Sequence, residues 1–156
     1  MSDDPTIKFL YIEDRPEVAK GFQRLLNSLG FQVTMAANYE QAVAACDGEK
    51  FDVVLTDMGF CGSKGYNKFA GLEMIGYIRG RFPDMPIVVL TGMDSEEDRQ
   101  ECLRGCDLQP IPIPILWKPV DVVELEEAIN RVLTKPSQPV PLPPPQLDAQ
   151  PPGAGA

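Results

Sequence analysis

Three short apolar runs constrain the fold of this chain more than any other feature of its sequence. They are IKFLYI at 7–12, interrupted only by Lys8, VVL at 53–55 and IVVL at 87–90. Runs this short and continuous are typical of strands that are buried on both faces of a parallel sheet. Helices must then cover both faces, because neighbouring parallel strands are joined by crossover connections.

Segments with helical spacing or capping signals lie between these runs. An apolar stripe over 18–29 ends at Gly30, and DSEEDRQECLRG at 94–105 opens with capping residues and an acidic first turn. The predicted helices cover 18–29, 39–47, 72–82, 94–105 and 125–133, and two further strands are predicted at 32–35 and in ILW at 115–117. Five alternations of strand and helix predict an α/β fold, a doubly wound five-stranded parallel sheet with helices on both faces.

The composition changes after Lys135. Eight of the 16 prolines fall within 136–152, and no aromatic residue follows Trp117. We therefore expect an N-terminal extension at 1–5, one globular domain at 6–134 and a disordered, proline-rich tail with polyproline II character at 135–156.

Charge and composition disfavour several classes of protein. The net charge of −9 argues against a general nucleic-acid binder, which needs a basic face. No stretch approaches the apolar length of a membrane span, and MSDDPTIKF is no signal peptide, so we expect a cytoplasmic protein. The chain has no histidine, and its four cysteines are interpreted as ordinary thiols.

Acidic side chains follow two of the predicted strands. Glu13 and Asp14 come directly after the first strand, and Asp57 follows the third. Because ligands bind where the carboxyl ends of parallel strands meet, we expect these three side chains to converge at one edge of the sheet. Three carboxylates that offer only oxygen ligands predict a site for a hard cation, and Mg²⁺ fits best.

A hydroxyl and a lysine follow the remaining two strands. Thr91 ends the fourth strand in VVLTG, and Lys118 ends the fifth in ILWKP. Opposite a cation, these two groups would form a clamp for a phosphoryl group. Each of the five residues alone is better interpreted as a solvated side chain, but all five at strand ends favour a functional site.

These motifs together carry a resemblance to a known family. With IED after the first strand, TDM after the third, LTG after the fourth and KP after the fifth, the chain resembles a response-regulator receiver domain of bacterial two-component signalling over residues 6–134. The resemblance implies the flavodoxin-like strand order 2-1-3-4-5 and a cis Lys118–Pro119 bond. It also implies a stand-alone receiver, which signals by protein–protein contact with a downstream target.

The resemblance assigns roles to the site residues. Asp57 would accept a phosphoryl group from a histidine kinase or a histidine phosphotransfer protein, while Thr91 and Lys118 bind phosphoryl oxygens. Asp14, the Asp57 carboxylate and the Gly59 carbonyl would ligate Mg²⁺, with Glu13 acting through water. Such a protein is no conventional enzyme, because it catalyses only its own Mg²⁺-dependent phosphorylation and dephosphorylation. The resemblance also allows a dimer on phosphorylation.

Three other functions are alternatives to this one. An aspartyl sugar-phosphate phosphatase needs a second Asp two residues after the nucleophile, where this chain has Gly59. A flavodoxin-like cofactor binder needs a phosphate loop after the first strand, where this chain has acids. A receiver fold that serves as a protein-binding module without phosphorylation remains the alternative.

Two segments depart from the family pattern. Thirteen residues, 58–70, follow Asp57, and we expect a loop that is either a lid or partner-selecting surface, or only a tolerated insertion. The switch position of the family, usually aromatic, is Ile115 here. Trp117 lies on the same face of the strand as Ile115. It either replaces the missing aromatic residue or only covers the edge of the sheet.

Overall fold

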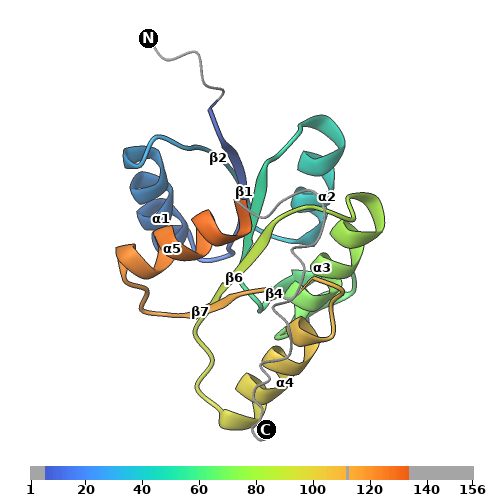
Figure 1. The fold of residues 1–156 in the computed structure, drawn as a ribbon. Coiled ribbons are helices and arrows are strands. Elements are labelled where there is room, and N and C mark those ends of the chain that lie inside the picture. The colour runs from blue at the N-terminus through green and yellow to red at the C-terminus, as the bar shows by residue number, and fades with distance from the viewer. Residues whose placement is uncertain (1–5, 112, 134–156) are drawn as a thin grey trace, which may run out of the picture.

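The computed structural model describes residues 6–111 and 113–133. Its main sheet contains five parallel strands in the order β2-β1-β3-β6-β7 (Figure 1). The strands are β1 (Lys8–Ile12), β2 (Gln32–Ala36), β3 (Val53–Thr56), β6 (Ile87–Thr91) and β7 (Ile115–Trp117). Counted along the chain without the separate β4–β5 pair, this is the predicted order 2-1-3-4-5, so the predicted fold class is confirmed.

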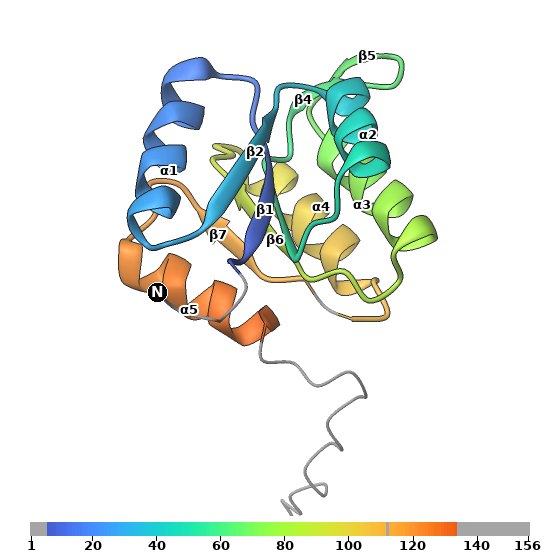
Figure 2. The ribbon, with the colours of Figure 1, turned by 90° about the horizontal axis from the view of Figure 1, so that it is seen from above.

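Five helices cover the two faces of the sheet. They are α1 (Pro16–Ser28), α2 (Tyr39–Gly48), α3 (Ala70–Arg81), α4 (Glu96–Asp107) and α5 (Val122–Leu133). Figure 2 shows α1 and α5 on one face and α2, α3 and α4 on the other. Local signals set where two of them begin: Asn38 and Ser95 cap α2 and α4 by accepting hydrogen bonds from backbone N–H groups of the first turn.

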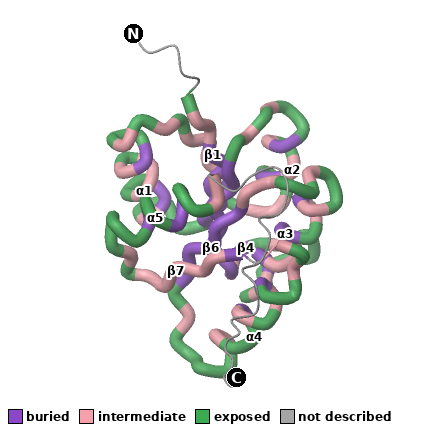
Figure 3. Tube along the Cα trace, viewed as in Figure 1, coloured by how far each residue is buried: buried purple, intermediate pink, exposed green. Residues whose placement is uncertain are grey.

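The alternation of side chains along β1 divides the core into two layers. Leu10 and Ile12 pack on the side of α2, α3 and α4, whereas Phe9 and Tyr11 pack on the side of α1 and α5. All four side chains are fully buried, as expected for a central strand with helices on both faces. In Figure 3 the buried positions accordingly gather along the central strands.

The segment 58–70 differs from the predicted loop. It contains a two-stranded antiparallel hairpin, β4 (Phe60–Gly62) and β5 (Gly65–Asn67), with Cys61 opposite Tyr66. The turn is closed by Gly65 at φ +108°, a backbone conformation that glycine adopts readily. The prediction of a loop was therefore wrong for the residues of β4 and β5. Strands of three residues are too short to show an alternating pattern, so the sequence carried no signal for them.

Some predictions fall outside the described residues. The extension at 1–5 and the tail at 135–156 stay predictions for this reason. Within the described part, no helix has the length and apolar character needed to cross a bilayer. The Lys118–Pro119 peptide bond is cis, as the family resemblance implied.

Candidate functional site

The carboxyl ends of the central strands position the predicted site residues. Backbone hydrogen bonds continue past the strand ends, from Asp57 N to Ile12 O at 2.9 Å and from Lys118 N to Thr91 O at 2.8 Å. The parallel ladder therefore holds these residues in register although they are far apart in the sequence. This is the edge at which open α/β sheets bind ligands.

The three acidic residues converge as predicted. One carboxylate oxygen from each of Glu13, Asp14 and Asp57 lies within 4.8 Å of the others. Glu13 and Asp57 are 2% and 5% exposed, while Asp14 faces solvent. Oxygen donors in such a cluster, open to solvent on one side, fit a hard divalent cation that keeps part of its water shell.

Lys118 joins the two buried carboxylates. Its Nζ donates to Glu13 Oε1 at 2.5 Å and to Asp57 Oδ2 at 3.2 Å. Burial raises the pKa of Glu13, and the hydrogen bond from Lys118 opposes that rise. The ammonium group thus connects the two buried carboxyl groups through hydrogen bonds.

Backbone groups fix the orientation of the Asp57 carboxylate. The Met58 N–H donates to Asp57 Oδ1 at 2.6 Å, which leaves Oδ2 facing Lys118. The first turn of α3 lies directly against this turn, because Gly71 N donates to Met58 O at 2.7 Å. A Cβ atom at Gly71 would lie 2.7 Å from Asp57 O and 2.9 Å from Met58 Cα, so only glycine allows this close approach.

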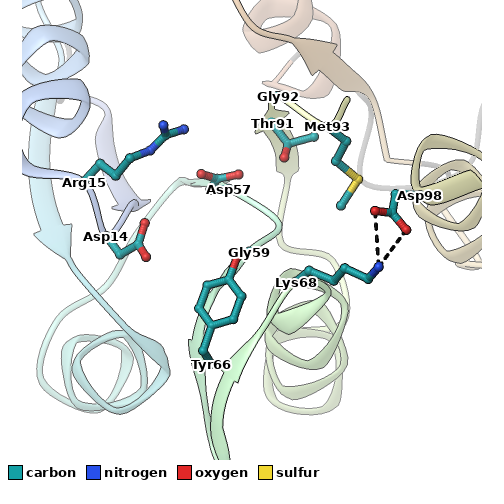
Figure 4. A pocket seen from close by; sticks show the side chains of 10 residues that line it. All are labelled: Asp14, Arg15, Asp57, Gly59, Tyr66, Lys68, Thr91, Gly92, Met93 and Asp98. Atoms are coloured by element: carbon teal, nitrogen blue, oxygen red, sulfur yellow. Dashed lines mark hydrogen bonds and ion pairs between the residues drawn. The ribbon is translucent and has the colours of Figure 1, made fainter. Parts of the chain in front are cut away.

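A pocket opens above Asp57 (Figure 4). Asp14 lies on one side, Thr91 on the opposite side, and Gly59 forms part of the lining. Thr91 is 3% exposed, so its side chain is placed by packing rather than by solvent. The predicted residues Asp14, Asp57, Gly59 and Thr91 all line this pocket, and Lys118, which is not among its lining residues, contacts Asp57 through Oδ2.

Other lining residues were missed as parts of the site. Tyr66 and Lys68 enter from the β4–β5 hairpin segment, which the sequence marked only by its length and its aromatic and basic residues. Asp98, interpreted from the sequence as a solvated or capping acid, forms an ion pair with Lys68 at 3.0 Å. Arg15 and Met93 carried no sequence signal for this pocket.

Trp117 lies beside Thr91 in the sheet. The two residues are paired in the register of β6 and β7, and Trp117 packs on the same side as Ile115, as the sequence predicted. The Arg99 guanidinium lies 5.1 Å from the centre of the Trp117 ring, and Arg99 Nε donates to Met93 O at 2.7 Å. The ring is therefore connected to the loop that follows Thr91.

Comparison with known families agrees with this geometry. The family model of the response regulator receiver domain matches residues 9–130. The chain belongs to this family. Receiver domains take part in two-component signalling with histidine kinases and downstream targets, and they generally bind Mg²⁺ at an acidic pocket.

Two curated relatives from different bacteria are larger proteins than this chain. The response regulator protein PilR of Pseudomonas aeruginosa is 26% identical over 126 residues, which cover 81% of this chain and 26% of PilR. The probable transcriptional regulatory protein TcrX of Mycobacterium tuberculosis is 28% identical over 98 residues, 63% of this chain and 39% of TcrX. The chain therefore spans well under half the length of these relatives.

Solved structures share the fold. The chemotaxis response regulator CheY4 of Vibrio cholerae superposes with a TM-score of 0.66 at 24% identity, over 83% of this chain and 100% of CheY4. The signal receiver domain of an HD domain-containing protein from Pseudomonas fluorescens superposes with a TM-score of 0.70 at 19% identity. The superposition covers 83% of this chain and 95% of that domain.

Proposed function

We propose that this receiver domain is a phosphoacceptor and that Asp57 takes a phosphoryl group from the phosphohistidine of a histidine kinase or phosphotransfer protein. The observation that carries the proposal is the setting of Asp57. Its carboxylate lies between the Met58 N–H and the Lys118 ammonium, with Asp14 and Glu13 close by. A carboxylate held in this way is oriented before the phosphodonor arrives, which lowers the entropic cost of attack.

The reaction is an in-line displacement at phosphorus. A carboxylate oxygen of Asp57 forms the new O–P bond while the P–N bond of the donor breaks, and the imidazole of the donor takes up a proton. Lys118 and the Thr91 hydroxyl stabilise the charge on the phosphoryl oxygens. Asp14, Asp57 and the Gly59 carbonyl would hold Mg²⁺, with Glu13 acting through water, and the ion would neutralise further phosphoryl charge.

The same groups support the later hydrolysis of the phosphoryl group, in which a water oxygen bonds to phosphorus, the Asp57 O–P bond breaks and inorganic phosphate leaves. The chain would in this way catalyse its own phosphorylation and dephosphorylation, without acting on a separate substrate. Its output would be contact with a downstream protein, or a dimer that forms on phosphorylation.

Intact-mass spectrometry after incubation with acetyl phosphate and Mg²⁺ tests the proposal. The expected result is one added phosphoryl group in the wild type and none in Asp57→Asn. A matched control is Asp52→Asn, which changes the exposed aspartate directly before the first residue of β3, at the end of the strand opposite to Asp57. This variant should still be phosphorylated. An unmodified wild-type mass would favour a binding module that works without phosphorylation.

A further inference from the structure

The β4–β5 hairpin brings a tyrosine into the phosphoacceptor pocket. Tyr66 lines the pocket together with Asp14, Asp57 and Gly59. In Figure 4 its ring extends from the hairpin and its hydroxyl points toward Asp57. The hydroxyl reaches close to the Gly59 backbone, because a Cβ atom at Gly59 would lie only 2.8 Å from Tyr66 Oη.

Contacts with three parts of the domain hold the hairpin that carries Tyr66. Phe60 at its start is fully buried in the core. At its turn, Ser63 N donates to Glu73 Oε1 on α3 at 3.1 Å, and the Ser63 hydroxyl donates to the same carboxylate. Just after its end, Lys68 pairs with Asp98 of α4. Tyr66 is therefore placed by a supported element, although 68% of the residue is exposed.

The chemistry of the pocket gives this hydroxyl a use. A phosphoryl dianion offers only acceptor oxygens, whereas the carboxylates around Asp57 offer no donors to it. Thr91 and Lys118 supply two donors from the sheet. A phenol hydroxyl supplies another donor without bringing a formal positive charge into the site.

We propose that Tyr66 is a further phosphoryl-binding residue, whose hydroxyl donates a hydrogen bond to the phosphoryl group on Asp57. The proposal rests on the function proposed for Asp57. It gives the β4–β5 hairpin a role in the site, because the hairpin supplies a hydrogen-bond donor from outside the five-stranded sheet.

Calorimetric titration of the full chain with beryllofluoride, a phosphoryl analogue, in the presence of Mg²⁺ tests the proposal. Tyr66→Phe removes only the hydroxyl and should weaken analogue binding roughly tenfold, as expected for one lost hydrogen bond to a charged group. The matched control is Tyr39→Phe on α2, outside the pocket, which should bind like the wild type. The lifetime of the phosphoryl group on Asp57 should be shorter in Tyr66→Phe than in the wild type, and it should be unchanged in Tyr39→Phe.

A double-mutant cycle tests whether the hairpin positions the hydroxyl. Glu73→Ala removes the carboxylate that holds the hairpin turn and should also weaken analogue binding. That loss should vanish in the Tyr66→Phe background, because the displaced hydroxyl is then already absent. An equal loss in both backgrounds would overturn the positioning role of the hairpin.

The outcomes separate this proposal from the proposed function. If the wild type binds no analogue, both are overturned. If the wild type and Tyr66→Phe bind equally well, only the role of Tyr66 is overturned. The same holds if Tyr66→Phe binds like the wild type but Tyr66→Ala binds weakly, because the ring would then only cover the pocket.

Discussion

Lys118 and Glu13, 105 residues apart in the sequence, form an ion pair in which Nζ lies 2.5 Å from Oε1. The Glu13 side chain is fully shielded from solvent and that of Lys118 is 13% exposed. Burial of two charges is costly, and removal of one partner leaves the other without compensation. The same ion pair therefore contributes both to the geometry of the site and to the stability of the fold.

Lys118→Met should lower the free energy of unfolding by about 1–3 kcal/mol at neutral pH, since Glu13 and Asp57 lose their buried cationic donor. Urea denaturation measures the loss. The control Lys20→Met, at an exposed position of α1, should stay within about 0.5 kcal/mol of the wild type. Equal stability of both variants would mean that solvent already screens the carboxylates.

Mg²⁺ should stabilise the unphosphorylated protein. The carboxylates of Glu13, Asp14 and Asp57 repel one another, and a cation bound only by the native state adds roughly 1.4–2.7 kcal/mol at ten- to hundredfold over its Kd. The melting temperature should rise with Mg²⁺ in the wild type and much less in Asp14→Ala. A melting temperature that ignores Mg²⁺ in the wild type contradicts the prediction.

Trp117, the only tryptophan, should report on the phosphoryl site. Its fluorescence should change when beryllofluoride and Mg²⁺ bind, because Arg99 connects the ring to the loop after Thr91. Thr91→Ala should reduce the analogue-dependent part, and Asp57→Asn should abolish it. Emission that does not respond to the analogue would show that Trp117 only covers the sheet edge.

Alanine substitutions at two glycines on α3 test the close approach of this helix to the backbone at Asp57. Gly71→Ala should destabilise the fold by about 1–3 kcal/mol, because its Cβ would meet the Asp57 and Met58 backbone below 3.0 Å. Gly76→Ala, where a Cβ meets nothing within 4 Å, should stabilise the helix by up to about 1 kcal/mol. Thermal or urea unfolding distinguishes the two, and the same sign for both would be inconsistent with the close approach.

Glu49 should give the fold a pH-dependent contribution away from the site. Its carboxylate accepts from Lys8 at 2.8 Å and from the Thr34 hydroxyl at 3.1 Å, and the Lys8 contact most lowers its pKa below the ordinary 4.5. A lowered folded-state pKa stabilises the fold above about pH 4.5, and this contribution is lost as the pH falls through the folded-state value.

Glu49→Gln should therefore be less stable than the wild type at neutral pH, by less than about 1 kcal/mol for this partly exposed pair. The difference should close under acidic conditions. Lys8→Met should show the same sign and pH trend, because it removes the main cause of the shift. A difference independent of pH would exclude the ion pair as its source.

The hairpin and the pocket rim lay beyond what the sequence alone could predict. Cys61 and Tyr66 pair across strands of only three residues, which carry no periodic signal. The hairpin depends on Phe60 in the core and on Glu73, which belongs to the separate element α3. Its place over Asp57 is therefore a product of tertiary packing.

The sequence by itself determined the five-stranded parallel sheet, its covering helices and the convergence of Asp14, Asp57 and Thr91 at one edge. These follow from local rules, since apolar runs define buried strands and parallel strands end at one edge. Only the tertiary structure decided that Lys118 would pair with Glu13 and that Tyr66 would enter the pocket. Such contacts depend on distances between side chains from separate elements, and those distances exist only once the elements have packed.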